Sequence, residues 1–292
     1  MRLLVTGNEG QLVRSLIERA PHAGVEIVAL GRPALDLAEP ESLARALEAV
    51  AFDALVNAAA YTAVDTAESE EALATRINGE SPGVLAGLAK ARGVPFLQVS
   101  TEYVFDGDGE RPYREDDPVG PVGAYGRSKL AGERAALAAN SHATVLRTAW
   151  VYSPFGGNFV KTMLRLGETR EEISVVADQH GNPSFAPDLA DAILAIASQC
   201  GTRAGFGAGI YHMTGSGEAV WADLAEAIFA EAERFGRKPV RVKRIASADY
   251  PTPAKRPKNS RLDNGRLRDV FGVTLPDWRE STRACVARLL AG

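Results

Sequence analysis

Two reactive side chains lie four residues apart in the stretch 120-GPVGAYGRSKLAGER-134. If this stretch is helical, Tyr125 and Lys129 project from one face, about a turn apart. A free tyrosine has a pKa of about 10, which is too high for ready proton exchange at neutral pH. A neighbouring ammonium favours the phenolate and brings that pKa closer to the working range, and it can also hydrogen-bond a cofactor ribose. Tyr-x-x-x-Lys spacing alone is common and fits a surface pair better, so the interpretation depends on the surrounding residues.

A hydroxyl group stands just upstream, at the end of the apolar run PFLQVS. Thr101 follows that run directly, at the expected ligand edge of a sheet, although serine and threonine at strand ends often serve only as caps or turn residues. A hydroxyl there can hydrogen-bond a substrate carbonyl while a tyrosine protonates the carbonyl oxygen. Together, Thr101, Tyr125 and Lys129 form the candidate catalytic set of a carbonyl-reducing enzyme.

The elements that must position this set alternate between strands and helices. Apolar runs typical of buried strands are RLLVTG, EIVAL, ALVNAAA, PFLQVS and ATVLRTAW. Between them, apolar residues recur at helical spacing in QLVRSLIERA, ESLARALEAV, SPGVLAGLAKARG and SKLAGERAALAAN. This alternation predicts an α/β fold, a Rossmann-type doubly wound parallel sheet covered by helices on both faces. Ligands of such sheets bind at the carboxyl ends of the strands.

The alternation loosens after Trp150, which predicts a second, smaller lobe. Residues 151–187 are rich in Gly, Pro and Asn and contain one predicted helix, GGNFVKTMLRL. Further helices are predicted for 187-PDLADAILAIASQC-200 and 221-WADLAEAIFAEAERFG-236, with a short strand, GIYHMTG, between them. We expect an NAD(P)-binding domain over residues 1–150, with a return segment near 187–214, and a C-terminal substrate lobe over 151–186 and 215–292.

Charge and composition exclude several classes of partner. The 292 residues carry 33 Lys and Arg against 37 Asp and Glu, so 33 − 37 gives a net charge of −4, which argues against a nucleic-acid or membrane-surface binder. The basic stretch 241–268 departs from this balance and fits a local anionic partner. Cys200 and Cys285 are too few and too distant for a metal site or a disulfide framework. With no signal peptide and no membrane-length apolar run, we expect a cytoplasmic protein.

A glycine turn follows the first predicted strand, in 5-VTGNEGQLV-13. Gly7 and Gly10 would let backbone N–H groups approach a pyrophosphate at a helix N-terminus. The pattern alone fits an ordinary tight turn as well, but its place at the first strand–helix junction favours a dinucleotide. Val13 occupies the third small position, which suggests a wider helix–sheet contact without blocking the phosphate.

The end of the second predicted strand bears on the choice of cofactor. Gly31 and Arg32 stand where an acidic residue would hold the ribose 2′-hydroxyl of NAD. A 2′-phosphate can therefore be accommodated, and NADPH is favoured over NADH, although Arg32 fits a solvated surface charge equally well. Asp36 and Leu37 fall where an adenine would be flanked, and Asp36 fits a helix N-cap equally well.

Five motifs, spread in order along almost the whole chain, resemble those of the extended short-chain dehydrogenases/reductases, and more specifically the dTDP-4-dehydrorhamnose reductase family. They are 57-NAAAYTAVDTAES-69, STEYVFDG, AYGRSKLAGE, 147-RTAWVYSPFGGNF-159 and 250-YPTPAKRPKNSRL-262. The resemblance implies NADPH- or NADH-dependent reduction of the 4-keto group of a dTDP-6-deoxyhexulose, giving dTDP-L-rhamnose. It also implies that residues 10–12 line the pyrophosphate and residues 60–62 the nicotinamide. The expected cofactor-binding residues are Gly7, Gly10, Gln11, Leu12, Arg32, Asp36, Leu37, Ala60, Tyr61, Thr62, Val99, Tyr125 and Lys129.

The resemblance further implies a set of substrate contacts. Trp150 would flank the sugar, since a flat apolar ring suits its C6 methyl face, although a core tryptophan at a strand end is the alternative. Asn158 and Arg256 would face the nucleotide, where an arginine fork suits a diphosphate. Val64 and Asp65 would lie near the same crevice, with Asp65 as partner of a sugar hydroxyl. The expected substrate-binding residues are Asp65, Thr101, Glu102, Trp150, Asn158 and Arg256.

The chain departs from the family pattern at three places. Glu102 replaces the usual Asp after the threonine, which keeps the charge but lengthens the side chain by one methylene, and Val13 replaces a glycine. Some members bind magnesium through glutamates at a dimer contact, but the matching positions here are Ser15 and Pro187. The resemblance therefore implies no structural metal, and a monomer or a differently built homodimer.

Other activities remain open at this point. A sugar-nucleotide dehydratase needs two carboxylates directly after the threonine, and here Tyr103 follows Glu102. An epimerase shares the fold and the Tyr-x-x-x-Lys pair, and no single residue excludes it. A reductase of another nucleotide-sugar is a further alternative. Loss of the Tyr-Lys pair or of the strand-end hydroxyl would favour a non-catalytic regulatory subunit, as in methionine adenosyltransferase. All three residues are present here.

Overall fold

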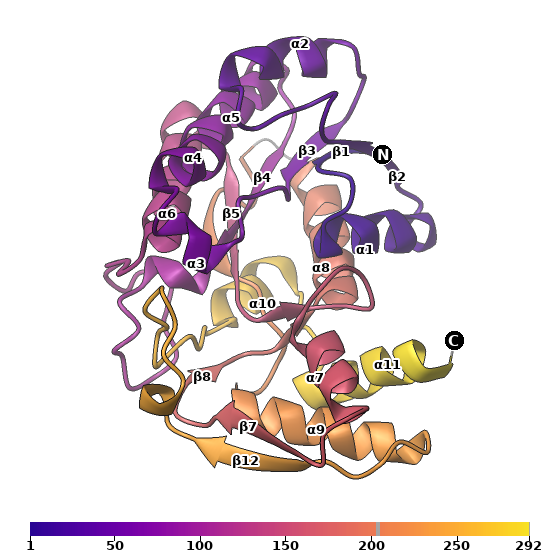
Figure 1. Ribbon diagram of the computed structural model, residues 1–292. Helices are drawn as coiled ribbons and strands as arrows, with labels where there is room; N and C mark the ends of the chain where they lie inside the picture. The colour runs from indigo at the N-terminus through magenta and orange to yellow at the C-terminus, as the bar shows by residue number, and fades with distance from the viewer. Residues whose placement is uncertain (203–204, 292) are drawn as a thin grey trace.

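The computed structural model describes residues 1–202 and 205–291. Its centre is a parallel six-stranded sheet in the order β10-β5-β4-β3-β1-β2 (Figure 1). The strands are β1 (Arg2–Thr6), β2 (Glu26–Leu30), β3 (Ala54–Asn57), β4 (Phe96–Thr101), β5 (Thr144–Thr148) and β10 (Gly209–His212). Strand order reverses between β1 and β3, as in doubly wound sheets, so the predicted α/β fold class is confirmed.

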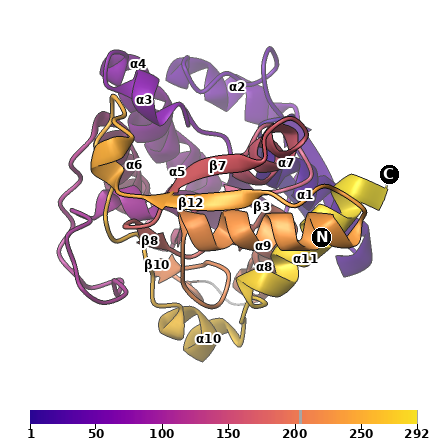
Figure 2. The same cartoon turned by 60° about the horizontal axis from the view of Figure 1, so that its bottom comes forward.

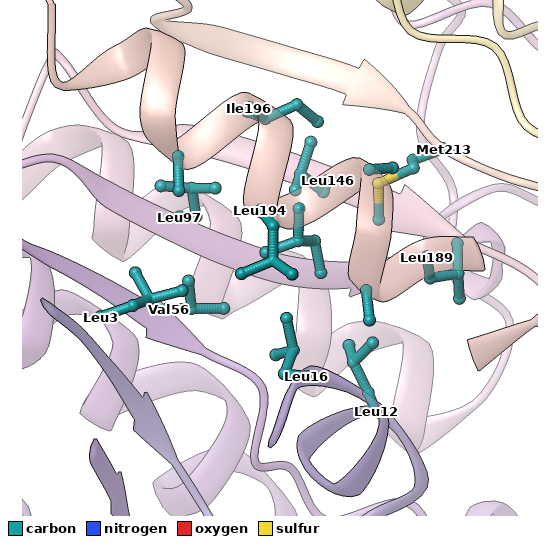
Figure 3. Close-up of a cluster of buried hydrophobic side chains, with 14 of the residues drawn as sticks. Leu3, Leu12, Leu16, Val56, Leu97, Leu146, Leu189, Leu194, Ile196 and Met213 are labelled. Carbon is teal, nitrogen blue, oxygen red and sulfur yellow. The ribbon is translucent and has the colours of Figure 1, made fainter. Parts of the chain in front are cut away.

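Helices cover both faces of this sheet. On one face lie α1 (Gln11–Arg19) and α8 (Ala186–Cys200), and on the other lie α2 (Leu43–Glu48), α5 (Ser81–Ala91) and α6 (Ala124–Ala139) (Figure 1). The buried strands send alternate side chains to the two faces, so that Leu3 and Val5 contact the α1–α8 side while Leu4 contacts the α2–α5 side. Figure 3 shows the first of these cores, where Leu16 of α1 and Leu194 of α8 meet the strands.

The predicted elements are largely present, with shifts at their ends. The segment ESLARALEAV forms only the short α2, which follows the 3₁₀ turn η2 (Pro40–Ser42). The first short 3₁₀ helix is η1 (Ala20–Ala23). The stretch after β3 contains α3 (Val64–Ala67), α4 (Glu71–Thr75) and a π-helical turn, η3 (Arg76–Glu80), which leads directly into α5. The strand predicted near 209–215 joins the sheet beside β5.

A second group of elements packs below the sheet around its own apolar core. It contains α7 (Phe159–Gly167), α9 (Trp221–Arg234) and α11 (Trp278–Ala291), with the parallel pair β7 (Glu172–Val176) and β12 (Arg241–Ile245). Figure 2 shows β7 and β12 side by side, with α9 next to β12. The remaining elements are β6 (Val151–Tyr152), β8 (His180–Gly181), β9 (Ser184–Phe185), β11 (Ala219–Val220), η4 (Glu102–Val104), η5 (Ser247–Asp249) and α10 (Gly265–Phe271).

Close approach of α6 to its neighbours fixes the part of the chain that carries Tyr125 and Lys129. A Cβ atom on Gly126 would overlap the backbone carbonyl of Tyr103, and one on Gly132 would overlap the carbonyl of Asn78. Only glycine therefore fits at these two positions. As a result, α6 lies against both η4 and η3, and its first turns are held at the edge of β4.

Candidate functional site

A cleft of about 1120 Å³ opens at the carboxyl ends of β1, β3, β4 and β5, where parallel sheets bind their ligands. Most of the residues expected at the site line it. These are Gly7, Gly10, Gln11, Leu12, Arg32, Asp36, Leu37, Ala60, Tyr61, Thr62, Val64, Val99, Thr101, Glu102, Tyr125, Lys129, Trp150 and Asn158. Asp65 and Arg256 lie outside the lining and contact each other beside it.

The glycine turn has the geometry that a phosphate needs. Gly7 has φ +97°, and its N–H donates to the carbonyl of Leu30, which ties the turn to β2. A Cβ atom there would lie 3.3 Å from both Ala59 and Val13, so space as well as conformation favours glycine. Gly10 is the N-cap of α1 and offers no side chain to its first N–H groups, which are left for a ligand.

The residues after β2 form the far end of the cleft. Arg32 is exposed to solvent at its lining. Asp36 is half-buried, and its Oδ1 accepts from the N–H of Ala38 at 2.9 Å, so it caps its own turn rather than a helix. Leu37 is buried, and its carbonyl accepts from the hydroxyl of Ser81.

Thr101 ends β4, lines the cleft and also caps η4, so the alternative role considered for it, that of a cap, is present. Its Oγ1 donates to Oε2 of Glu102 at 2.7 Å and accepts from the N–H of Tyr103 at 3.3 Å. Glu102 is only 4% exposed, and burial raises its pKa to about 7, with the hydrogen bond from Thr101 opposing the rise. A carboxyl group that titrates near neutral pH therefore stands directly beside the candidate catalytic hydroxyl.

Tyr125 lies in the first turn of α6, its ring edge-on to Tyr103 at 5.4 Å between centroids. Burial raises the pKa of Tyr125 above its usual value, the nearby Glu102 and Tyr103 add to the rise, and a hydrogen bond with Thr101 opposes it. The sequence interpretation expected a fall in the pKa of Tyr125 beside Lys129, but the net shift in the protein alone is upward. Burial has the largest effect on this pKa.

Lys129 lies on the floor of the cleft. Its ammonium donates to the carbonyl of Val99 on β4 at 2.7 Å, and its side chain is 4% exposed. Burial lowers the pKa of Lys129 to about 8, while the negative charge of Glu133, one turn further along α6, opposes that fall. Lys129 is thus mostly protonated at neutral pH and loses its charge in mildly alkaline solution.

Asn78, which the sequence interpretation missed, orders the segment around Tyr61. It lies in the π-helical turn η3 and is buried. Its Oδ1 accepts from the N–H of Tyr61 at 2.8 Å, and its Nδ2 donates to the Tyr61 carbonyl and to Ser128 on α6. One amide therefore joins the segment around Tyr61 to α6. The Asn-Gly pair inside a helical run was the available signal.

Trp150 lines the cleft in a left-handed backbone conformation, φ +47°. Its ring stacks on Trp221 of α9 with centroids 3.7 Å apart and an interplanar angle of 10°. Gly181 lies under its edge, where a Cβ atom would overlap the ring. Trp150 is half-buried and reaches the cleft. Trp221, which no local pattern marks, supports it from the second lobe.

Both polar groups of the Asn158 side chain form hydrogen bonds within the protein. Its Oδ1 caps α7 by accepting from the N–H of Lys161, and its Nδ2 donates to the carbonyl of Ser153 at 2.7 Å and to Oε1 of Gln11 at 3.0 Å. The hydroxyl of Ser153 donates to the same Gln11 oxygen at 2.8 Å. This amide therefore joins the glycine turn to the loop before α7.

Asp65 and Arg256 form an ion pair at the edge of the cleft. Nη2 of Arg256 donates to Oδ2 of Asp65 at 2.6 Å, and the backbone N–H of Ala254 donates to Oδ1. Nη1 of Arg256 also donates to the hydroxyl of Tyr103 at 3.4 Å, and Tyr103 itself lines the cleft. The pair therefore holds the basic segment 250–262 against α3.

The positions considered for a metal have other roles. Ser15 is buried and its hydroxyl donates to the carbonyl of Gln11, and Pro187 is buried in the first turn of α8. Residues 1–202 and 205–291 contain no cluster of three or more His, Cys, Asp or Glu side chains arranged to hold a metal ion. In the same described ranges, we find no helix whose length and apolar character would suit a membrane span.

A doubly wound parallel sheet, a glycine turn at the first strand–helix junction and a Thr-Tyr-Lys set in one cleft define a nicotinamide-dependent oxidoreductase of the short-chain dehydrogenase/reductase class. The family described as the RmlD substrate binding domain matches residues 1–291. The chain belongs to this family, so the resemblance to dTDP-4-dehydrorhamnose reductases is confirmed.

Individual relatives match this chain over nearly its whole length and nearly the whole of their own. A dTDP-4-dehydrorhamnose reductase from Sinorhizobium fredii is 47% identical over 99% of this chain and 98% of its own. The crystal structure of such a reductase from Clostridium acetobutylicum superposes with a TM-score of 0.91, with 36% identity and 99% of both chains covered. One from Bacillus anthracis in complex with NADP gives a TM-score of 0.90, with 32% identity over 98% of this chain and 99% of that one.

Proposed function

We propose that the protein reduces the C4 keto group of dTDP-4-dehydro-L-rhamnose with NADPH, giving dTDP-L-rhamnose. The observation that carries this proposal is the convergence of Thr101, Tyr125 and Lys129 on one cleft beside the glycine turn. The dTDP-4-dehydrorhamnose reductases in its family support the substrate. NADP in the Bacillus anthracis relative, together with the exposed Arg32 at the cleft lining, supports NADPH as the cofactor.

The side chains present fit such a cofactor, because Gly7 and the uncapped start of α1 leave backbone donors for a pyrophosphate. When bound, NADPH supplies the hydride for the carbonyl carbon. Tyr125 protonates the carbonyl oxygen, and its raised pKa keeps it in the protonated form that a proton donor needs. Thr101 hydrogen-bonds the same oxygen, and Lys129, held near Val99, contacts the ribose.

The second lobe and the edge of the cleft supply the substrate contacts in this proposal. Trp150, supported by Trp221, presents a flat face to the deoxy-sugar. Arg256 meets the diphosphate, and to do so its guanidinium shares or leaves the ion pair with Asp65. Asn158 acts chiefly by fixing the loop before α7, since its amide is already hydrogen-bonded on both sides.

The test is consumption of NADPH, followed at about 340 nm, with the keto-sugar generated in situ from dTDP-glucose by a dehydratase and an epimerase. Tyr125→Phe should lower turnover by about 10²–10⁴-fold because the proton donor is lost, while NADPH binding stays near normal. Tyr250→Phe is the matched control, since Tyr250 is 62% exposed and lies away from the cleft lining. Wild-type turnover by the Tyr125 variant would refute the assignment of the donor.

The same assay separates the alternatives. No NADPH consumption from a protein that still binds NADP would favour another nucleotide-sugar or a regulatory subunit, and tightly held, unexchanged NAD in the purified protein would favour an epimerase. We further propose that the enzyme acts in the cytoplasm as a monomer, or as a homodimer built without a bridging metal, because Ser15 and Pro187 offer no carboxylate. Light scattering with and without a chelator tests the assembly, which should be unchanged.

A further inference from the structure

The hydroxyl group of Thr101 has a single proton to donate and two acidic neighbours. It donates that proton to Oε2 of Glu102 at 2.7 Å, and it lies near enough to Tyr125 to lower the pKa of that phenol. The N–H of Tyr103 donates to the same hydroxyl oxygen. While Glu102 is ionised, Thr101 therefore has no proton left for a carbonyl oxygen in the cleft.

We propose that Glu102 is a positioning residue that acts through Thr101, because only its neutral carboxyl group releases the Thr101 proton towards the reacting carbonyl oxygen. A carboxylate can only accept hydrogen bonds, whereas a carboxylic acid can donate one. Neutral Glu102 donates to the Thr101 oxygen, and the Thr101 O–H turns into the cleft. The inference rests on the proposed function, since the reacting oxygen belongs to the proposed keto-sugar.

The surroundings of Glu102 keep about half of it in the neutral form at pH 7. Burial raises its pKa to about 7. The titratable groups that face it are Tyr103 on η4 and Tyr125 on α6, both protonated at this pH because burial raises their pKa values as well. Arg256 and Asp65, which form an ion pair, lie on the far side of Tyr103. Their charges have opposite effects on the pKa of Tyr103. Within residues 1–202 and 205–291, no Lys or Arg forms an ion pair with Glu102.

The neutral and ionised forms should differ in rate by about 10²–10³-fold, the usual effect of one donor to a developing oxyanion. In the wild type, kcat/KM should therefore fall about tenfold per pH unit above pH 7. The fall should end at the lower kcat/KM of the enzyme with ionised Glu102. Glu102→Gln keeps a donor at every pH, because the amide N–H takes the place of the acid O–H. This variant should be within a few-fold of wild type at pH 6 and should keep its activity until Lys129 loses its proton near pH 8.

Two further variants separate this role from a structural one. Glu115→Gln is the matched control, because burial also raises the pKa of Glu115 but its carboxylate binds the backbone of His212 away from the cleft lining. It should keep the wild-type pH profile. Thr101→Val should lose activity at pH 6 and show no fall near pH 7, since Glu102 acts only through Thr101. A Glu102→Gln profile with the wild-type fall near pH 7 would overturn the inference.

A measurement without turnover tests the protonation state of Glu102 separately from the proposed function. Infrared difference spectra between pH 6 and pH 8 should show a protonated carboxyl group in the wild type that disappears at the higher pH and is missing from Glu102→Gln. Absence of turnover at any pH would refute the proposed substrate, whereas an ionised Glu102 at pH 6 would refute the switch, whatever the substrate proves to be.

Discussion

Replacement of Glu133 by Gln should destabilise the fold and also alter the site. Glu133 lies on α6 and Arg147 on β5, and their side chains are 2% and 1% exposed. Nε and Nη2 of Arg147 donate to the two carboxylate oxygens at 2.9 and 2.7 Å, and the hydroxyl of Ser100 donates to one of them. The pair thus joins α6 to the sheet, two turns beyond Tyr125.

The cost follows from what the substitution leaves behind. Loss of one partner of a buried ion pair costs about 3–5 kcal/mol, because the other charge stays buried without compensation. Few other interactions would compensate the Arg147 charge. Its Nη1 already has no hydrogen-bond partner, and its guanidinium group otherwise lies over the Phe105 ring, 5.0 Å from the ring centroid. With total stabilities of about 5–15 kcal/mol, such a loss is a large part of the whole.

The same substitution should act on Lys129. Glu133 opposes the fall in the pKa of Lys129 that burial causes, so its removal moves that pKa below about 8. With a pKa of 8, about nine-tenths of Lys129 is charged at pH 7, and a fall of one unit leaves about half. The affinity for NADPH should then decline at a lower pH than in the wild type, because the ribose contact needs the ammonium.

Urea unfolding and NADPH titrations between pH 6 and pH 9 measure the two effects. The double variant Glu133→Gln/Arg147→Met removes both charges while keeping the volume, so it should recover most of the lost stability. It should not recover the Lys129 shift, which depends on the carboxylate. A single variant within about 1 kcal/mol of wild type, or a double variant no more stable than the single one, would refute the reasoning.

Three further predictions concern other residues. His212 is fully buried, and burial together with the Arg147 charge lowers its pKa from 6.5 to about 3. As the pH falls, the unfolded chain therefore binds a proton at His212 at a higher pH than the folded protein does. The free energy of unfolding should fall below pH 6.5, by about 1.4 kcal/mol at pH 5.5. His212→Gln should lose this pH-dependent part, so equal changes in the urea midpoint between pH 7.5 and 5.5 for variant and wild type would contradict it. Arg32→Ala should weaken NADPH binding about tenfold and leave NADH binding nearly unchanged, and equal losses for both cofactors in fluorescence titrations would count against a 2′-phosphate contact. Trp221→Ala should raise the KM of the keto-sugar several-fold without changing NADPH affinity, because Trp150 loses its stacking partner, while Phe235→Ala at the end of the same helix should change neither value.

Features that depend on neighbours in the chain could be predicted from the sequence. The strands appear as short apolar runs, and the glycine turn follows from Gly7 standing at the first strand–helix junction. Because the carboxyl ends of parallel strands share one edge, strand order was not needed to bring Thr101 to the same cleft as that turn. Placing Tyr125 and Lys129 there needed only the helix that follows β4.

Contacts between distant segments could not be predicted in this way. Trp150 contacts Trp221 and Asp65 contacts Arg256, although the members of each pair are far apart in the sequence. Nothing in the local sequence around either member identifies its partner. The predicted fall in the pKa of Tyr125 was wrong for a related reason. Spacing identifies a nearby charge, but burial, which here has the larger effect, depends on every element around the ring.

Helix α6 carries both chemistry and stability on one face. Tyr125, Lys129 and Glu133 follow one another at intervals of four residues, so the proposed proton donor, the ammonium proposed to contact the ribose and the buried ion pair lie on successive turns. Gly126 and Gly132 allow the close packing that holds this face in register with β4. A substitution in the helix therefore changes fold and activity together, and a loss of rate alone says little about catalysis. Variants that restore stability without restoring charge, such as the Glu133–Arg147 double replacement, are what separate the two.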